Sequence, residues 1–180
     1  IDSATLINKV FEVIEAQRIF NINFKKFEIL IHPKSYVHAI IKFNNGLSKI
    51  LVHDSDMKIP IFNSIYDKNN LGYKTSKLNI KILNNLNFSK VNAKKFPSIK
   101  LLKYIPDNIS LYETVLVSSN DELVDLFLKG KIKFETISHN LHKILRMKEF
   151  VKFKKRSPKN YNELIILSNY VRLKTKHLCI

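Results

Sequence analysis

The stretch IDSATLINKVFEVIEA, residues 1–16, decides the fold of the first part of this 180-residue chain. Apolar side chains recur in and just after it at helical spacing and leave little of the circumference polar: Leu6, Ile7, Val10, Phe11, Val13, Ile14 and Ile19. A helix that is apolar on most sides is usually buried. We therefore predict a long buried helix from Ser3 to about Ile19, with Ser3 as its N-cap.

Four polar residues interrupt this apolar helix. Asn8 and Glu12 are four residues apart and so share one face, Lys9 lies three residues before Glu12, and Glu15 is close by. Burying such charges costs roughly several kcal/mol unless each is paired or bound to an ion. A cation, a phosphate or both would satisfy them. The alternative is an ordinary exposed Lys9–Glu12 ion pair, worth about 0.3–0.5 kcal/mol and without function.

The next segment carries strand patterns and a turn. Residues 27–31 (FEILI) predict a short strand, and residues 36–43 and 47–53 predict two more. The sequence Asn44-Asn45-Gly46 between the last two is a strong turn signal, so we predict a β-hairpin. Residues 56–66 hold one central proline and predict a loop that runs into a short helix.

The second half of the chain follows a polar, turn-rich segment at residues 67–77. Residues 78–88 are mixed and suggest a short strand, and Pro97 opens an apolar-periodic stretch at 99–105. Three helices follow, and their short connections predict a small antiparallel bundle. They are expected at residues 110–128, with Gly130 as the C′ residue, at 134–147 and at 160–175.

Lysine dominates the charge of the chain. The 31 basic residues outnumber the 15 acidic ones and give a formal net charge of +16, yet only 4 of them are arginine. Arginine makes the bidentate contacts to guanine and phosphate, so a specific nucleic-acid reader should have more of it. The accompanying 24 isoleucines and 19 asparagines are typical of an AT-rich coding sequence. A lysine-rich nucleic-acid-binding module, centred on the basic run at 152–156, is the alternative function.

Composition excludes several classes of protein. The hydrophobic content of 45% argues against a disordered chain. The single cysteine, Cys179, rules out an intrachain disulfide and fits a reducing compartment. No apolar run reaches the roughly 20 residues that a bilayer-spanning helix requires, so we expect no membrane partner.

Three blocks of residues together form a long compound pattern. They are DSATxxNKxxExIEA at 2–16, HPxSxxH at 32–38 and DMxxPI at 56–61. In this order and spacing they resemble 1-deoxy-D-xylulose 5-phosphate reductoisomerase, and fainter echoes follow at 96–101, 119–121 and 130–134. That family converts 1-deoxy-D-xylulose 5-phosphate into 2-C-methyl-D-erythritol 4-phosphate for isoprenoid precursors. It uses NADPH and a divalent cation, Mg²⁺ or Mn²⁺.

The resemblance implies roles for the polar residues of the first helix. Glu12 matches a carboxylate ligand of the cation, a hard oxygen donor of the type that Mg²⁺ and Mn²⁺ prefer. Ser3, Asn8 and Lys9 match residues that hold the phosphate and nearby hydroxyls of the substrate. Catalysis would rest on Glu12 and Lys9.

Three further residues are candidates for the surroundings of the site. Glu15 would orient Lys9 or Glu12, although a plain structural ion pair is equally compatible with its position. His38 would lie near the site on its strand; a lone strand histidine is more often a satisfied core residue. Met57 would cover the pocket toward the nicotinamide; a lone methionine more often serves packing alone.

The same resemblance implies what the chain lacks. We find no Gly-rich dinucleotide loop after a strand, and no acidic Asp-Ser-Glu cluster for the other cation ligands. The three glycines stand far apart, at Gly46, Gly72 and Gly130. We therefore expect the C-terminal part of the enzyme, without the N-terminal NADPH-binding domain, with no cofactor-binding residues of its own and inactive alone.

The predicted fold class is α+β. Residues 1–66 would be the end of an α/β catalytic domain, with the long buried helix and the hairpin, 67–95 a linker, and 96–180 a C-terminal helical bundle. The resemblance further implies a small sugar-phosphate substrate, no nucleic-acid partner and a homodimer in the complete enzyme. A bacterial cytoplasm is expected rather than a plastid-type compartment, because no transit-like segment is visible.

Overall fold

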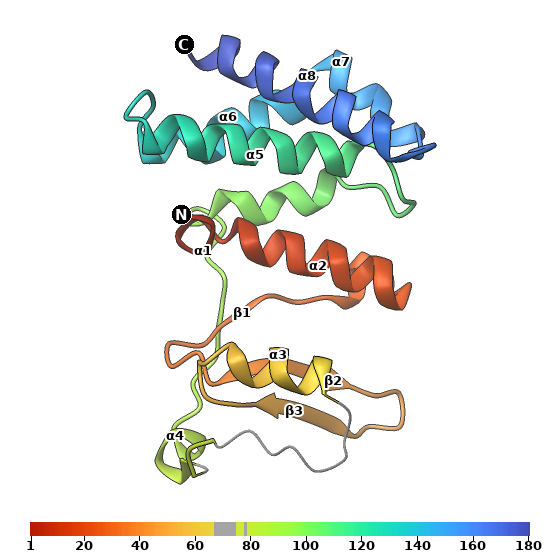
Figure 1. The fold of residues 1–180 in the computed structure, drawn as a ribbon. Coiled ribbons are helices and arrows are strands. Elements are labelled where there is room, and N and C mark those ends of the chain that lie inside the picture. The colour runs from red at the N-terminus through yellow and green to blue at the C-terminus, as the bar shows by residue number, and fades with distance from the viewer. Residues whose placement is uncertain (67–74, 78) are drawn as a thin grey trace. The chain divides into compact units, whose positions relative to one another are not determined.

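The structure is a computed structural model that describes residues 1–66, 75–77 and 79–180 (Figure 1). It is mostly helical, with a few short strands. The chain forms two compact units, one made of residues 1–28 and 92–180 and the other of residues 29–91. Among the described residues, no helix has both the length and the apolar character needed to cross a membrane.

The first unit is a helical assembly around one apolar core. Its elements are α1 (Asp2–Thr5), α2 (Ile7–Phe20), η1 (Phe24–Lys26), η2 (Pro97–Tyr104), α5 (Tyr112–Leu128), α6 (Phe134–Leu145), α7 (Lys148–Val151), η3 (Lys152–Lys155) and α8 (Tyr161–Cys179). Fully buried side chains from α2, η2, α5 and α6 meet in this core, among them Val10, Leu101, Leu116 and Leu141. The predicted three-helix bundle is confirmed as α5, α6 and α8, and α2 packs into the same core.

The predicted continuous first helix is wrong, because the chain breaks at Leu6. Leu6 has a left-handed backbone, with φ of 58°, and separates α1 from α2. This conformation costs a non-glycine residue about 1–2 kcal/mol. Ile7 and Val10, which follow the break, are completely buried. Ser3 accordingly lies inside α1 and is not an N-cap.

The predicted long helix is buried along one face only. α2 buries Ile7, Val10, Val13, Ile14 and Gln17 along one face. Ile19, one of the apolar residues that led us to expect burial on most sides, is instead 66% exposed, and the neighbouring Phe20 is 67% exposed. The polar residues of α2 therefore have a solvent-facing side on which to gather.

Gly130 ends α5 as predicted. Its φ is 68°, its N–H donates to the Phe127 carbonyl, and the Lys131 N–H donates to the Leu126 carbonyl. These two bonds form a Schellman motif, which satisfies carbonyls that the end of a helix leaves free. The following basic run lies in η3, where Phe153 is buried beside Phe150 of α7. Core packing therefore explains both phenylalanines.

The second unit contains four short strands and two helices. Its elements are β1 (Leu30–Ile31), β2 (Val37–Lys42), β3 (Ser48–Val52), α3 (Lys58–Ile65), α4 (Ile80–Asn84) and β4 (Ser89–Lys90). β2 and β3 form the predicted antiparallel hairpin, with Ile40 opposite Ile50, and Gly46 adopts φ of 88° in its turn. β1 pairs with β4 and is shorter than the predicted strand. Residues 80–84 belong to the mixed stretch in which a short strand was suggested; they form α4, where Asn79 caps the helical turn.

Both faces of the hairpin carry exposed apolar side chains. Ile40 and Ile41, neighbours that point to opposite faces, are 44% and 47% exposed, and Ile50 and Leu51 on β3 are 48% and 50% exposed. Among the described residues β2 pairs only with β3. The hairpin therefore buries little apolar surface within the described structure.

The compact units divide the chain differently from the predicted domains. Residues 1–28 share a core with the C-terminal helices, whereas the prediction joined them to the hairpin within 1–66. Part of the predicted linker 67–95, namely 67–74 and 78, lies outside the described residues. The three domain ranges therefore stay a prediction for a complete enzyme.

Candidate functional site

Three polar side chains meet on the outer side of α2. The Lys9 ammonium donates to both carboxylate oxygens of Glu12, at 3.0 Å to Oε1 and 2.8 Å to Oε2. Asn8 Nδ2 lies 3.5 Å from the same Oε1. The Lys9 and Glu12 side chains are 43% and 55% exposed. The predicted grouping of these residues is thus present, at the surface of the first unit.

The backbone explains why these groups face outward together. Ile7 and Val10 are fully buried and fix the inner face of α2, so residues 8, 9 and 12 lie on its other sides. They occupy the first turns of the helix, where free N–H groups and the helix dipole favour an anion. Asn8 Oδ1 is buried and has no hydrogen-bond partner in the described structure.

Two other predicted residues of this region do not join the group directly. Ser3 is exposed on α1, and within the described structure its side chain makes no hydrogen bond to Asn8, Lys9 or Glu12. Glu15 is exposed one turn further along α2 and forms no ion pair with a described residue. The roles assigned to Ser3 and Glu15 stay predictions.

His38 and Met57 belong to the second unit. His38 is exposed on β2, so it is not a core residue; its ring stacks on that of His53 at 3.5 Å between centroids, and its Nε2 lies 3.2 Å from the His53 carbonyl oxygen. Met57 precedes α3 and is 59% exposed. Their places in an active site stay predictions.

The second and third sequence blocks lie beside each other within this unit. A hollow of about 380 Å³ is lined by Lys34 and Tyr36 from the second block, by Asp56 and Ile59 from the third, and by neighbouring residues. Two segments that are separated by the hairpin in sequence therefore share one concave surface. Met57 does not line it.

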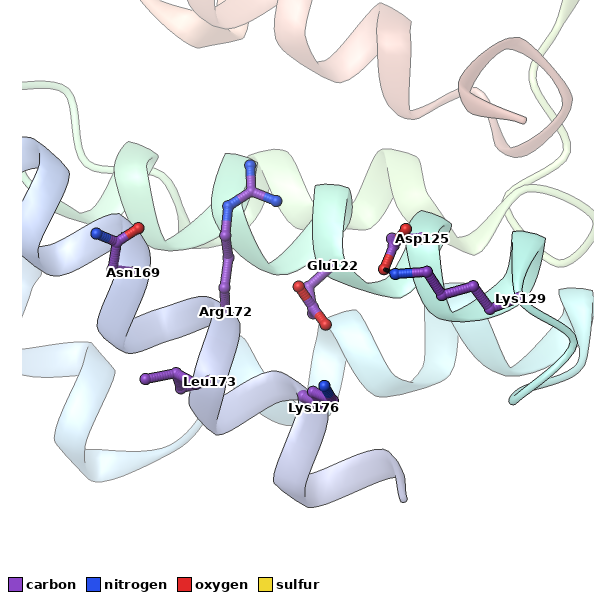
Figure 2. Close-up of a pocket in the computed structure, with 7 residues that line it drawn as sticks. All are labelled: Glu122, Asp125, Lys129, Asn169, Arg172, Leu173 and Lys176. Atoms are coloured by element: carbon purple, nitrogen blue, oxygen red, sulfur yellow. Dashed lines mark hydrogen bonds and ion pairs between the residues drawn. The ribbon is translucent and has the colours of Figure 1, made fainter.

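A groove of about 430 Å³ lies between α5 and α8 (Figure 2). Two of its cationic side chains are paired: Lys129 Nζ is 2.6 Å from Asp125 Oδ2, and Arg172 donates at 2.6 Å to Asp121, which lies outside the groove lining. None of the residues singled out in the sequence lines it.

The described residues offer only part of a cation site. They contain no group of three or more His, Cys, Asp or Glu side chains placed to hold a metal ion. Glu12 supplies one carboxylate, and Asn8 turns its Nδ2 toward that carboxylate. A cation there would need further ligands.

The described glycines do not form a dinucleotide-binding loop. Gly46 turns the hairpin and Gly130 ends α5, so neither leads from a strand into a helix N-terminus. The absence of cofactor-binding residues from this chain stays a prediction.

Sequence reasoning missed one contact that bears on this region. Asn120 of α5 is 1% exposed, and its Nδ2 donates to Asp2 Oδ1 of α1 at 3.1 Å. The available signal was the polar run Ser118-Ser119-Asn120 inside an otherwise apolar helical pattern.

A family model described as the DXP reductoisomerase C-terminal domain matches residues 53–174. The chain belongs to this family. The match begins just after β3 and includes the third sequence block and most of the helical bundle. The resemblance of all three blocks is confirmed by a relative that aligns over the whole chain.

Full-length relatives of the family extend over the whole chain. The DXP reductoisomerase of Pelagibacter ubique is 56% identical over 180 residues, which is 100% of this chain and 46% of that protein. The enzyme of Persephonella marina is 34% identical over 167 residues, covering 93% of this chain and 43% of that protein. The chain thus spans about half the length of the curated relatives it matches.

Solved structures of the family share the fold. A DXP reductoisomerase from Zymomonas mobilis in complex with NADPH aligns with a TM-score of 0.83 at 26% identity, over 99% of this chain and 46% of that one. A DOX-P reductoisomerase in complex with NADPH, fosmidomycin and magnesium aligns with a TM-score of 0.88 at 24% identity, over 98% and 44%, which bears on the fold alone.

Proposed function

We propose that this chain supplies the substrate-phosphate and cation-binding side of an NADPH-dependent 1-deoxy-D-xylulose 5-phosphate reductoisomerase. The observation that carries the proposal is the surface group formed by Asn8, Lys9 and Glu12 at the start of α2, in a chain of this family. Assembly as a homodimer and a cytoplasmic location, both implied by the resemblance, belong to the same proposal.

The phosphate would be held by donors from α1 and α2. Lys9 offers an ammonium, Asn8 an amide and Ser3 an exposed hydroxyl, next to the helix N-terminus of α2. Charge-assisted hydrogen bonds of this kind are short and strong. Fixing the phosphate, which does not react, orients the ketose for the rearrangement.

The cation would be held in part by the Glu12 carboxylate. When bound, Mg²⁺ or Mn²⁺ supplies a Lewis acid that polarises the carbonyl of the substrate. Glu12 fixes that charge at the edge of α2, close to the phosphate donors. Glu15, one turn away, would support this arrangement by its negative charge.

The Lys9–Glu12 ion pair links the two binding events. In the structure the two charges neutralise each other, at 2.8 Å. A surface pair of this exposure contributes only about 0–1 kcal/mol, so it is exchanged readily. We infer that Lys9 turns to the phosphate as Glu12 turns to the cation, and each released charge gains a partner of opposite sign.

The test uses a chimera in which the matching segment of the Pelagibacter ubique enzyme is replaced by residues 1–180. Lys9→Ala is expected to raise KM for the ketose phosphate by about 10- to 100-fold, because a charge-assisted contact is lost. Glu12→Gln is expected to lower kcat at least about tenfold and to raise the Mg²⁺ concentration for half-maximal rate. NADPH oxidation reports both.

Matched controls are Lys131→Ala and Glu135→Gln, which remove the same charges from exposed positions elsewhere in the first unit. Both should leave kcat and KM unchanged. The 180-residue chain by itself should neither bind NADPH tightly nor consume the ketose phosphate. Unchanged kinetics in both α2 variants, or turnover by the chain alone, would refute the assignment.

A further inference from the structure

Asn120 joins the helical bundle to the helix that precedes the candidate site. It lies in the middle of α5 and is 1% exposed, and its Nδ2 donates to Asp2 Oδ1 at 3.1 Å across 118 residues of sequence. An ionised carboxylate only accepts hydrogen bonds, so the amide nitrogen must face Asp2. The amide Oδ1 is buried and has no partner among the described residues.

This contact bears on α1, which needs external support. α1 is a single turn, Asp2–Thr5, and a helix of that length is not stable by itself. Its bonds from Thr5 Oγ1, to the Ile1 and Asp2 carbonyls, are local and do not attach it to the rest of the unit. Leu6, in the left-handed region, then separates it from α2. The Asn120–Asp2 bond is therefore a long-range polar tether of α1.

The tether acts directly beside a proposed phosphate ligand. Asp2 is covalently adjacent to Ser3, so holding the Asp2 carboxylate limits where the Ser3 hydroxyl lies relative to Asn8 and Lys9. Placement within about 0.5 Å is what a preorganised binding site requires of its ligands.

We propose that Asn120 is a positioning residue for the substrate phosphate: its buried amide holds Asp2 and thereby places Ser3. The inference rests on the proposed function, because it assumes that Ser3, Asn8 and Lys9 bind the phosphate. Asn120 itself touches neither phosphate nor cation. Its effect should therefore fall on the affinity for the sugar phosphate.

A neighbouring residue of α5 provides the matched control. Ser118 is 3% exposed, and its hydroxyl donates to Ser168 Oγ of α8 at 2.8 Å. Ser118→Ala thus removes a buried hydrogen bond from the same helix without touching α1. A residue that only stabilises the bundle should behave like Ser118, whereas a positioning residue should also alter substrate binding.

The experiment measures kcat and both KM values in the same chimera. Asn120→Ala is expected to raise KM for the ketose phosphate about tenfold, with KM for NADPH unchanged. Asn120→Asp should raise it further, because two carboxylates would then face each other. The exchange Asp2→Asn with Asn120→Asp restores an amide–carboxylate pair and should return KM toward its original value. Ser118→Ala should change neither KM.

Specific outcomes would overturn the proposal. They are an unchanged KM for the ketose phosphate in Asn120→Ala, an equal rise in both KM values, or no rescue by the exchange. If Asn120→Ala yields no folded protein, Asp2→Ala at the half-buried partner tests the same contact. If Lys9→Ala also leaves the ketose-phosphate KM unchanged, the proposed function fails; if only the Asn120 and Asp2 variants are silent, the positioning role alone fails.

Discussion

His142 on α6 is held in its neutral form by its surroundings. Its Nε2 lies 3.0 Å from the Pro97 carbonyl and donates to it, while its Nδ1 is buried without a partner among the described residues. Burial is the main cause that lowers the pKa of His142, and the positive charge of Arg146 acts in the same direction, whereas the bond to the Pro97 carbonyl opposes the shift. Protonation would place a charge on the unpartnered nitrogen.

Stability should therefore fall in mild acid. The unfolded chain protonates its histidines near pH 6.5, above the folded-state pKa of His142, so the unfolded state binds more protons as the pH falls. The contribution of neutral His142 is complete above about pH 6.5 and is lost as the pH falls through the lower, folded-state pKa. Urea unfolding between pH 7.5 and 5 should show a loss that His142→Gln reduces.

His177, exposed on α8, is the control, because it is not among the groups that shift the pKa of His142. His177→Gln should not reduce the loss. An equal effect of the two substitutions would show that general charge repulsion, and not the unpartnered nitrogen of His142, causes the loss.

At the scale of elements, the end of α5 depends on one backbone conformation. Gly130 has φ of 68°, and a Cβ added there would meet no atom within 4 Å. Space is therefore not limiting, and Gly130→Ala should cost about 1–2 kcal/mol of unfolding free energy through conformation alone. Gly130→Asn should cost less, because asparagine tolerates the left-handed region. Urea titrations measure both, and equal costs would contradict this explanation.

The sequence predicted regular elements well wherever local signals were strong. The turn Asn44-Asn45-Gly46 and the cap at Gly130 both require a positive φ that glycine supplies, so hairpin and helix end were predictable. The break at Leu6 was not, because no local rule places a leucine in the left-handed region; Ile7 and Val10, which follow it, are fully buried. Tertiary packing overrode local preference.

Only part of the candidate site could be predicted from the sequence. Asn8, Lys9 and Glu12 are neighbours through helical spacing, which is visible in the sequence. The Asn120–Asp2 contact joins residues 118 positions apart, and no periodicity reports such a distance. The positions of His38 and Met57 relative to α2 depend on how two units assemble, which is beyond local patterns.

At the scale of the whole molecule, one arginine links the two sequence segments of the first unit. Arg18 near the end of α2 donates to the carbonyls of Pro106 at 2.8 Å and Asn108 at 3.0 Å, to the Asp107 carbonyl, and to the Glu113 carboxylate of α5. The side chains of Arg18 and Glu113 are only 17% and 20% exposed. The two sequence segments of the unit, 1–28 and 92–180, meet at this group.

Arg18→Met should destabilise the chain by about 2–3 kcal/mol, because it leaves the Glu113 carboxylate without its charged donor. Arg146→Met is the comparison, since Arg146 donates to the hydroxyl of Tyr104 in an exposed place and should cost less. Both are measured by urea unfolding at neutral pH. If Arg18→Met lowers the free energy of unfolding no more than Arg146→Met does, the contacts of Arg18 contribute little to stability.

The net charge of +16 does not by itself indicate a nucleic-acid partner. Much of it is lysine on exposed faces, and the phenylalanine of the densest basic run, Phe153, is buried in the core. The nucleic-acid alternative is not supported by these residues or by the family match. The lysine that carries a proposed function is Lys9, which faces a single carboxylate.

Amide hydrogen exchange in the β2–β3 hairpin should report the assembly of a complete enzyme. A two-stranded ribbon that exposes apolar side chains on both faces is at most marginally stable in water. Its amide protons should therefore exchange quickly with deuterium until other polypeptide covers those faces, while the core of α5 stays protected. Exchange at Ile40 and Ile50 would measure, peptide by peptide, when a complete enzyme has come together.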